Sequence, residues 1–184
     1  DRVLRNSEIQ INHPDWDIEK VTKKTGVFQR HISGINETAF DLSRKAVEKM
    51  LTKNEVTVNN IDGIIFCTQS PDYIMPSNAF LIHKHFGFGS NVWAFDYNLA
   101  CSGFVYGLAI CRGMIETNMA QNILLISADT YSKYINPNDR STKVLFGDAA
   151  AVSLISKEEG SGIIDIELAA SGWEYESFYI PSGG

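Results

Sequence analysis

Cys101 is the residue best placed for chemistry, because it lies where a stretch typical of a buried strand runs into one typical of a helix. Residues 92–97 are rich in β-branched and aromatic side chains, and apolar residues then recur at helical spacing through Met114 and Ile115. A thiol at a helix start meets unpaired N–H groups and the positive end of the helix dipole, which favour a negative charge. The pattern therefore predicts a nucleophilic thiolate at Cys101.

The residues around Cys101 suit this chemistry. Ala100, Ser102 and Gly103 are small and leave room for a substrate carbonyl beside the sulfur, and Asn98 could support the sulfur by a hydrogen bond. The alternative is a structural cysteine, because free cysteines are among the most buried residue types and are usually unreactive. The position alone leaves both interpretations open.

The other cysteines and the histidines are interpreted as packing or surface residues. Cys67 falls in an apolar strand and Cys111 in the middle of a helix, and three cysteines are too few for a disulfide framework, which indicates a reducing, cytoplasmic compartment. No metal site is predicted, since no recognisable ligand spacing links the four histidines, His13, His31, His83 and His85.

Composition excludes several classes of protein. The chain has 184 residues, 44% of them hydrophobic, which suits one soluble domain or half of a larger fold. A net charge of -6 argues against nonspecific nucleic-acid binding, and no apolar run is long enough to span a membrane. The first residues lack the apolar core of a signal peptide, and the chain does not start with Met, so we expect a piece of a longer gene product.

In the first third of the chain, the sequence pattern predicts short helices, one extended segment and then an amphipathic helix. Residues 6–24 are polar and suit short helices, with Gly26 as a helix stop, and residues 27–32 suit an extended segment. Asn36 is expected to cap the following amphipathic helix, which continues to Leu51.

Apolar strands then alternate with helices, without a linker between them. Pro76 and Ser77 are expected to begin one helix, which ends at residues 87–89, and another helix follows Cys101. The expected apolar strand segments are 61–68, 92–97, 123–128 and 162–169, and two further apolar stretches, 144–148 and 149–155, precede the last of them. This alternation predicts a single α/β domain over residues 1–184, with a mostly parallel sheet covered by helices on both faces.

Separated segments of the chain, taken together, resemble a known family. They are residues 24–32 (KTGVFQRHI), 75–77 (MPS), 95–104 with Cys101, 139–142 (DRST), 146–151 (FGDAAA) and 171–184. In order and spacing they are similar to the N-terminal half of the β-ketoacyl-acyl-carrier-protein synthase III family, condensing enzymes of the thiolase fold. The resemblance implies a thiolase-like fold and makes Cys101 the catalytic nucleophile.

The activity that the resemblance implies is a two-stage Claisen condensation in fatty-acid or related biosynthesis. Cys101 would take an acyl group from a primer thioester, and malonyl-acyl-carrier protein would then lose CO₂ and attack that acyl group. The Cys101 N–H would help to stabilise the tetrahedral intermediate. The family's catalytic His and Asn lie in its C-terminal half, outside this chain, and none of the four histidines here matches that motif.

The implied partners are an acyl-carrier protein, a coenzyme A thioester or both, with no cofactor beyond these thioesters, and a second copy of the chain. In the family, residues 92–97 would lie near the two-fold axis of a homodimer. Arg140 matches an arginine that contacts the coenzyme A nucleotide, and the alternative is a solvated loop charge. Lys20 replaces the tryptophan with which many members stack on the adenine, so recognition of the donor is expected to differ here.

Lys20 also belongs to a small basic cluster with Lys23 and Lys24. This cluster suits a phosphopantetheine donor or an acidic carrier protein, and the alternative is a plain solvated helix end. Met75 matches a position that reaches into the partner's acyl tunnel, or it is a buried methionine without a role in specificity. Phe146 would line the tunnel or belong to the core. Gly147 suits a close backbone approach, and Asp148 is expected to fix a turn.

Two other functions remain open from the sequence. The chain could belong to an acyltransferase that passes the acyl group from Cys101 to an oxygen or nitrogen nucleophile. It could also belong to a non-catalytic partner subunit of an active homologue, although such partners usually lose the nucleophile.

Overall fold

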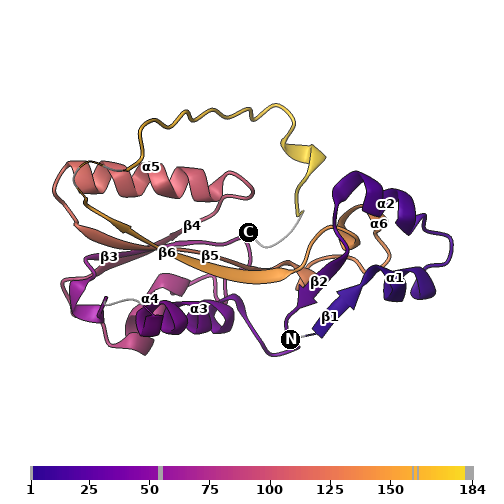
Figure 1. Cartoon of the computed structure of the whole chain (residues 1–184), viewed down its shortest axis with the longest axis horizontal. Helices are drawn as coiled ribbons and strands as arrows, with labels where there is room; N and C mark the ends of the chain where they lie inside the picture. The colour runs from indigo at the N-terminus through magenta and orange to yellow at the C-terminus, as the bar shows by residue number, and fades with distance from the viewer. Residues whose placement is uncertain (1, 54–55, 159, 161, 181–184) are drawn as a thin grey trace.

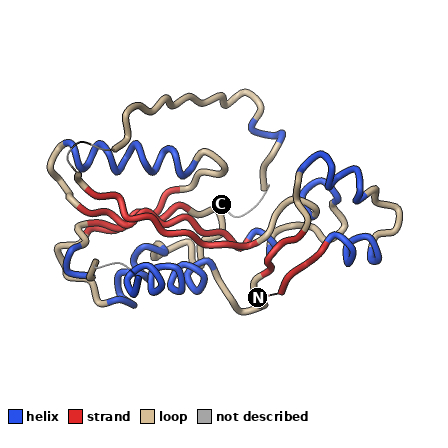
Figure 2. The backbone as a smooth tube through the Cα atoms, in the orientation of Figure 1, coloured by secondary structure: helices blue, strands red, loops and turns tan. Residues whose placement is uncertain are grey.

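A computed structural model of the chain describes residues 2–53, 56–158, 160 and 162–180, and shows a layered body with a smaller N-terminal lobe beside it (Figures 1 and 2). The lobe contains β1 (Arg2–Arg5), α1 (Asn6–Asn12), α2 (Ile18–Thr25) and β2 (Gln29–Ile32). Strands β1 and β2 pair antiparallel, with Val3 opposite His31. Residues 181–184, the end of the last family-like segment, lie outside the described residues.

The body is built on a four-stranded mixed sheet in the order β4-β3-β5-β6. Its strands are β3 (Gly63–Cys67), β4 (Trp93–Tyr97), β5 (Asn122–Thr130) and β6 (Asp148–Ser156). Strand β3 runs parallel to β4 and β5, whereas β6 is antiparallel to β5. The predicted mostly parallel sheet is therefore confirmed, and β6 is its antiparallel strand. Because β3, β4 and β5 are parallel, their carboxyl ends meet at one edge, which is where α/β sheets place ligand sites.

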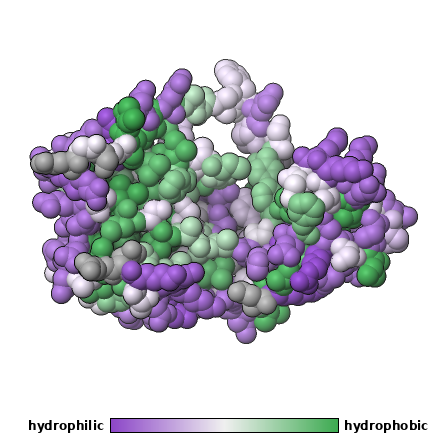
Figure 3. Space-filling model, in the orientation of Figure 1, coloured by the Kyte–Doolittle hydropathy of each residue, from purple (hydrophilic) through white to green (hydrophobic). Residues whose placement is uncertain are grey.

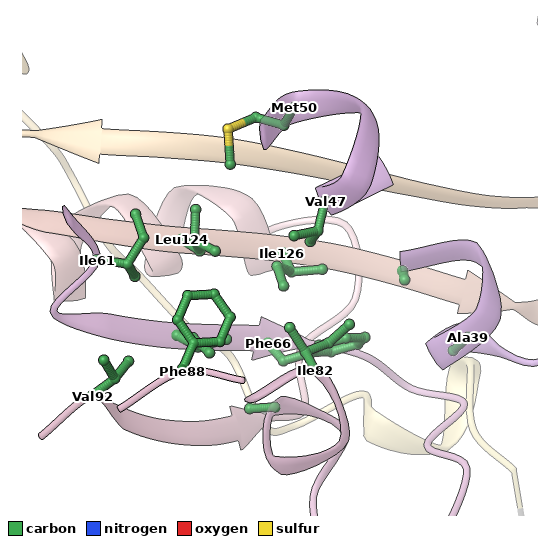
Figure 4. Close-up of a cluster of buried hydrophobic side chains, with 13 residues drawn as sticks. Ala39, Val47, Met50, Ile61, Phe66, Ile82, Phe88, Val92, Leu124 and Ile126 are labelled. Carbon is green, nitrogen blue, oxygen red and sulfur yellow. The ribbon is translucent and has the colours of Figure 1, made fainter. Parts of the chain in front are cut away.

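Helices cover both faces of this sheet (Figure 1). Helices α3 (Ala39–Lys53) and α4 (Asn78–Phe86) lie on one face, and α5 (Gly103–Glu116) lies on the other. Figure 4 shows Val47 and Met50 of α3 beside the sheet residues Leu124 and Ile126. A second cluster under α5 includes Cys111, Ile65 and Leu125. Cys111 is fully buried and Cys67 nearly so, as expected for core cysteines.

Helix ends largely follow the sequence signals. Gly26 and Gly87 end α2 and α4 in the left-handed conformation, with φ of 70° and 68°, where a side chain would add strain. The prediction that Asn36 caps the next helix is wrong, because α3 begins at Ala39. Thr38 caps it instead, since its Oγ1 accepts a hydrogen bond from Asp41 N–H at 3.3 Å.

The lobe is joined to the body through a buried arginine. The Arg30 guanidinium, on β2, donates to the Val144 carbonyl oxygen and to Asn6 Oδ1, and the residue is only 3% exposed. Val144 follows the short helix α6 (Arg140–Lys143) and packs into the lobe core with Leu4 and Ile9. The loop after α6, which leads to Phe146, is therefore held against the lobe.

The strand expected at residues 162–169 is wrong. These residues take no strand pairing in the described part of the chain and instead run as an exposed segment over α5 (Figure 1). Side chains of α5 hold the segment: Tyr106 Oη donates to the Ala169 carbonyl at 3.1 Å, and Arg112 Nη1 to the Ile164 carbonyl at 3.4 Å. The apolar residues in this segment are compatible with an extended chain. A strand also needs a neighbouring strand with a free edge, which these residues do not find among the described strands.

The surface differs between the two parts. Figure 3 shows apolar surface gathered over the body, whereas polar residues prevail over the lobe. No helix among the described residues is long and apolar enough to cross a membrane.

Candidate active site

Cys101 lies in the turn between β4 and α5, at the carboxyl edge of the sheet. The helix begins at Gly103 with Ser102 as its N-cap, two residues later than the sequence pattern suggested. Cys101 is exposed, in contrast to the other two cysteines. Within the described residues its N–H donates to no backbone or side-chain acceptor, so this group is free to bind a substrate oxygen.

The turn rests on close contacts beneath it. Cys67 Sγ, at the end of β3, donates to the Leu99 carbonyl at 3.3 Å, and Tyr97 Oη donates to the Gly103 carbonyl at 2.7 Å. A Cβ on Gly103 would lie 2.5 Å from Cys67 Sγ, so only glycine fits here without movement. Glycine at this position lets the start of α5 approach the sheet and fixes the height of Cys101 above it.

Burial separates the other two cysteines from Cys101 chemically. Burial raises the pKa of the Cys67 thiol, although hydrogen bonds with Tyr97 and Leu99 oppose the shift. Burial also raises the pKa of Cys111 to about 12. Both thiols therefore stay protonated and unreactive at neutral pH.

Cys101 faces a cavity of about 360 Å³ whose surface is mainly apolar. The loop from α6 to β6 supplies Phe146 and Gly147, and β6 supplies small side chains. The full lining is Gln69, Ala100, Cys101, Ser127, Ala128, Asp129, Tyr131, Phe146, Gly147, Ala149, Ala150, Ala151 and Phe178. Such a space suits an apolar group attached to the sulfur.

A half-buried carboxylate, Asp129, stands near the end of β5 in this lining. Its Oδ1 accepts hydrogen bonds from Gln69 N–H at 2.7 Å, Ser70 Oγ at 3.1 Å and Thr68 Oγ1 at 3.2 Å. Burial raises the pKa of Asp129, and these donors oppose that rise. The carboxylate thus ties the segment after β3 to the end of β5.

Tyr131 adds a second polar side chain to the lining. Its Oη donates to Gln69 Oε1 at 2.5 Å, and its ring centroid lies 5.2 Å from that of Phe146. Burial, followed by the charges of Asp129 and Cys101, raises the pKa of Tyr131, so the phenol keeps its proton and remains the donor to Gln69.

The loop that carries Phe146 is fixed on its other side by Gly147 and Asp148. A Cβ on Gly147 would lie 2.8 Å from the His31 carbonyl oxygen, which confirms the predicted close backbone approach. Asp148 Oδ2 accepts from Ser33 N–H at 2.8 Å and from Ser132 Oγ at 2.6 Å. Asp148 therefore joins the segment after β2 to the segment after β5, rather than fixing a local turn as predicted.

Of the other residues predicted for the site, Phe146 lies in the Cys101 cavity, while Arg140, Met75 and Lys20 contribute no part of the lining described above. Arg140 is exposed at the start of α6, where the Asp139 carboxylate accepts from Ser141 N–H at 2.9 Å. Met75 is 80% exposed, so the interpretation as a buried methionine is wrong. Lys20 is exposed on α2.

The cavity lining contains no histidine in the described part of the chain. His83 and His85 lie on α4, His31 on β2 and His13 at the end of α1. No three potential metal ligands among His, Cys, Asp and Glu gather within the described residues.

Sequence reasoning missed Gln69, Asp129, Tyr131 and Phe178. A signal for the first two was present, because each follows an apolar run that forms one of two adjacent parallel strands. Residues at the carboxyl ends of such strands converge. No local pattern indicated Phe178, which comes from the exposed C-terminal segment and lies 6.1 Å from Phe146 between ring centroids.

Comparison with known proteins agrees with this geometry. The family model for 3-oxoacyl-[acyl-carrier-protein (ACP)] synthase III matches residues 95–172, which include the Cys101 turn and Phe146. The β-ketoacyl-[acyl-carrier-protein] synthase III of Rickettsia bellii is 38% identical over 99% of this chain and 57% of that protein. The corresponding protein of Caldanaerobacter subterraneus subsp. tengcongensis is 37% identical over 100% of this chain and 55% of its own length.

Solved structures show the same fold. One 3-oxoacyl-(acyl-carrier-protein) synthase III is 41% identical, with a TM-score of 0.83 over 88% of this chain and 48% of that one. The Pseudomonas aeruginosa 3-oxoacyl-(acyl carrier protein) synthase III has a TM-score of 0.90 at 28% identity, over 100% of this chain and 57% of its own. The expected thiolase-like α/β fold is confirmed, and the chain spans little more than half the length of the curated relatives that it matches. Over its whole length the chain is similar to part of the 3-oxoacyl-[acyl-carrier-protein] synthase III proteins.

Proposed function

We propose that this chain is the single, nucleophile-bearing domain of a 3-oxoacyl-[acyl-carrier-protein] synthase III, and that Cys101 accepts the acyl group. One observation carries the proposal. Among the three cysteines, Cys101 is the exposed one, and it stands before α5 and beside an apolar cavity. A thioester carbonyl that enters this cavity can therefore reach the Cys101 sulfur and the unpaired Cys101 N–H together.

The first step is a thioester exchange. The Cys101 sulfur attacks the carbonyl carbon of the primer thioester, a new C–S bond forms, and the donor's C–S bond breaks to release the donor thiol. The oxygen of the tetrahedral intermediate is negatively charged, and the unpaired Cys101 N–H is a suitable donor for it. Removing one such donor typically costs about 3 kcal/mol of transition-state stabilisation.

The second step joins two carbon atoms. Malonyl-acyl-carrier protein loses CO₂, the resulting carbanion attacks the acyl-cysteine, and the Cys101 sulfur leaves as the β-ketoacyl thioester forms. The described lining has no histidine, so we assign the decarboxylation to groups outside this chain, in agreement with the family resemblance.

Donor binding is assigned to the region near α6 and the lobe. Exposed Arg140 is available for a phosphate of coenzyme A or of a phosphopantetheine arm. In the basic cluster on α2, Lys23 pairs with Glu19 at 2.7 Å, while Lys20 and Lys24 stand exposed for an acidic carrier protein. Acyl-carrier protein is therefore the proposed partner.

The proposed enzyme is a cytoplasmic homodimer of fatty-acid biosynthesis. Strand β4 is an edge strand of the sheet, which suits pairing with a second copy. The loop before α4 exposes Ile74 and Met75, with 95% and 80% of their surface accessible, and such apolar residues suit a partner's surface.

Acylation of the full-length protein tests the function. The protein is incubated with acetyl-coenzyme A, and the acyl adduct is located by intact mass and peptide mapping. We expect one adduct, on Cys101, and none in Cys101→Ser. Cys111→Ala is the matched control, because it removes another cysteine and should keep the adduct. An adduct on Cys67 or Cys111, or none with any thioester, would refute the proposal.

A further inference from the structure

The Cys101 cavity has a larger neighbour. A second cavity, of about 740 Å³, lies on the far side of Gln69, Tyr131 and Phe178, which line both spaces. Part of its remaining lining is apolar and comes from Tyr73, Ile74, Ile135 and Ile180. The shared residues form a wall between the two cavities.

The wall is held closed by polar and aromatic contacts. Tyr131 Oη donates to Gln69 Oε1 at 2.5 Å, and the Gln69 N–H is itself fixed by Asp129 at 2.7 Å. The Tyr131 ring packs on Phe146, which in turn packs on Phe178, with centroids 5.2 Å and 6.1 Å apart. A group that pushed Tyr131 aside would leave the Gln69 oxygen without its donor, which is unfavourable in a part-buried site.

We propose that the Tyr131–Gln69 pair sets the length of the acyl chain that Cys101 accepts, and that longer chains enter the second cavity only when this wall is opened. Tyr131 is then a specificity-determining residue. The inference rests on the proposed function, because it requires an acyl group on Cys101. Each methylene that gains a buried, apolar position is worth about fourfold in affinity.

Three variants of the full-length protein test the wall. Tyr131→Ala opens it, and Tyr131→Leu opens it less while keeping apolar bulk, in case the alanine variant does not fold. Tyr134→Ala is the matched control, because Tyr134 lines the second cavity but not the Cys101 cavity. Acetyl and octanoyl thioesters of N-acetylcysteamine serve as probes, since they avoid any effect on coenzyme A or carrier-protein recognition. The readout is the ratio of octanoyl to acetyl transfer rates to Cys101, measured by intact mass.

We expect Tyr131→Ala to raise this ratio at least tenfold and Tyr131→Leu by a smaller factor, whereas Tyr134→Ala should change it less than twofold. If both Tyr131 variants keep acetyl transfer and their ratio stays within twofold of that of the unsubstituted protein, the proposed role of the wall is refuted. An equal rise in Tyr134→Ala would also overturn it. Absence of any acyl group on Cys101 of the unsubstituted protein would instead refute the proposed function, and with it this inference.

Discussion

The contact between Gly103 and Cys67 makes a strong prediction about the turn that carries Cys101. In Gly103→Ala the new Cβ would lie 2.5 Å from Cys67 Sγ and 3.5 Å from Leu99 Cβ. Relief requires α5 to move away from β3, and overpacking of this kind costs about 1–3 kcal/mol. The higher helix propensity of alanine returns about 0.5–1 kcal/mol. We therefore expect a net loss of about 1–2 kcal/mol in the free energy of unfolding.

The same helix offers a matched control. A Cβ on Gly113 would meet no neighbouring atom within 4 Å, so Gly113→Ala should gain about 0.5–1 kcal/mol from propensity alone. Removing the Cys67 sulfur should also restore stability to the Gly103→Ala protein. Cys67→Ala alone loses the thiol's packing and its bond to Leu99, but combined with Gly103→Ala it leaves the two Cβ atoms 3.9 Å apart. The double variant should be more stable than the sum of the single effects by about 1–2 kcal/mol.

Urea unfolding of these four variants and of the unsubstituted protein, followed by far-ultraviolet circular dichroism, measures these energies. Iodoacetamide labelling of Cys101 reports whether the turn has moved, and the double variant should return its rate toward that of the unsubstituted protein. Equal stability of the Gly103→Ala and Gly113→Ala proteins would refute the packing argument. The packing argument would also be refuted if the stability changes of Cys67→Ala and Gly103→Ala simply added in the double variant.

Two further variants test the supports around the cavity. Burial raises the pKa of Asp148, but hydrogen bonds from Ser132 and Ser33 outweigh it and hold the pKa below its ordinary value. The carboxylate therefore stabilises the fold above the pKa of an unfolded aspartate, and this contribution is lost as pH falls through the folded pKa. Asp148→Asn should lower the free energy of unfolding by about 2–4 kcal/mol at pH 7, with a smaller difference below about pH 4, measured by urea titrations at both pH values. Tyr97→Phe removes the donor to the Gly103 carbonyl and should cost about 1 kcal/mol in the same assay, and an unchanged midpoint would show that this bond contributes nothing.

Much of the layered body could be predicted because its signals are local. The apolar runs at 61–68 and 123–128 became β3 and β5, and Gly26 and Gly87 ended helices as expected. Local signals failed where the outcome depends on a partner. Residues 162–169 have the composition of a strand, but whether they pair depends on a sheet edge that no window of sequence encodes.

The candidate site divides in the same way. Cys101 could be found from the strand-to-helix junction, since the junction and the small residues beside it are consecutive in sequence. The wall of Gln69, Tyr131 and Phe178 could not be predicted as a unit, because its members come from three distant segments. Their side chains meet through hydrogen bonding and ring packing that only the folded chain brings together. The exposure of Met75 could not be predicted from its residue type, because an apolar side chain is compatible with both a buried and an exposed position.

The buried arginine that joins lobe and body affects the order in which this chain can fold. The Cys101 turn closes over 32 positions, from Cys67 to Leu99, whereas the bond from Arg30 to Val144 spans 114 and that from Ser33 to Asp148 spans 115. Loop-closure entropy makes distant pairs slower to form. As synthesis proceeds from the N-terminus, Arg30 emerges long before its acceptor, so the Cys101 turn can assemble while the aromatic side of the pocket is still open. Mutations in the lobe should therefore slow formation of the pocket more than formation of the Cys101 turn.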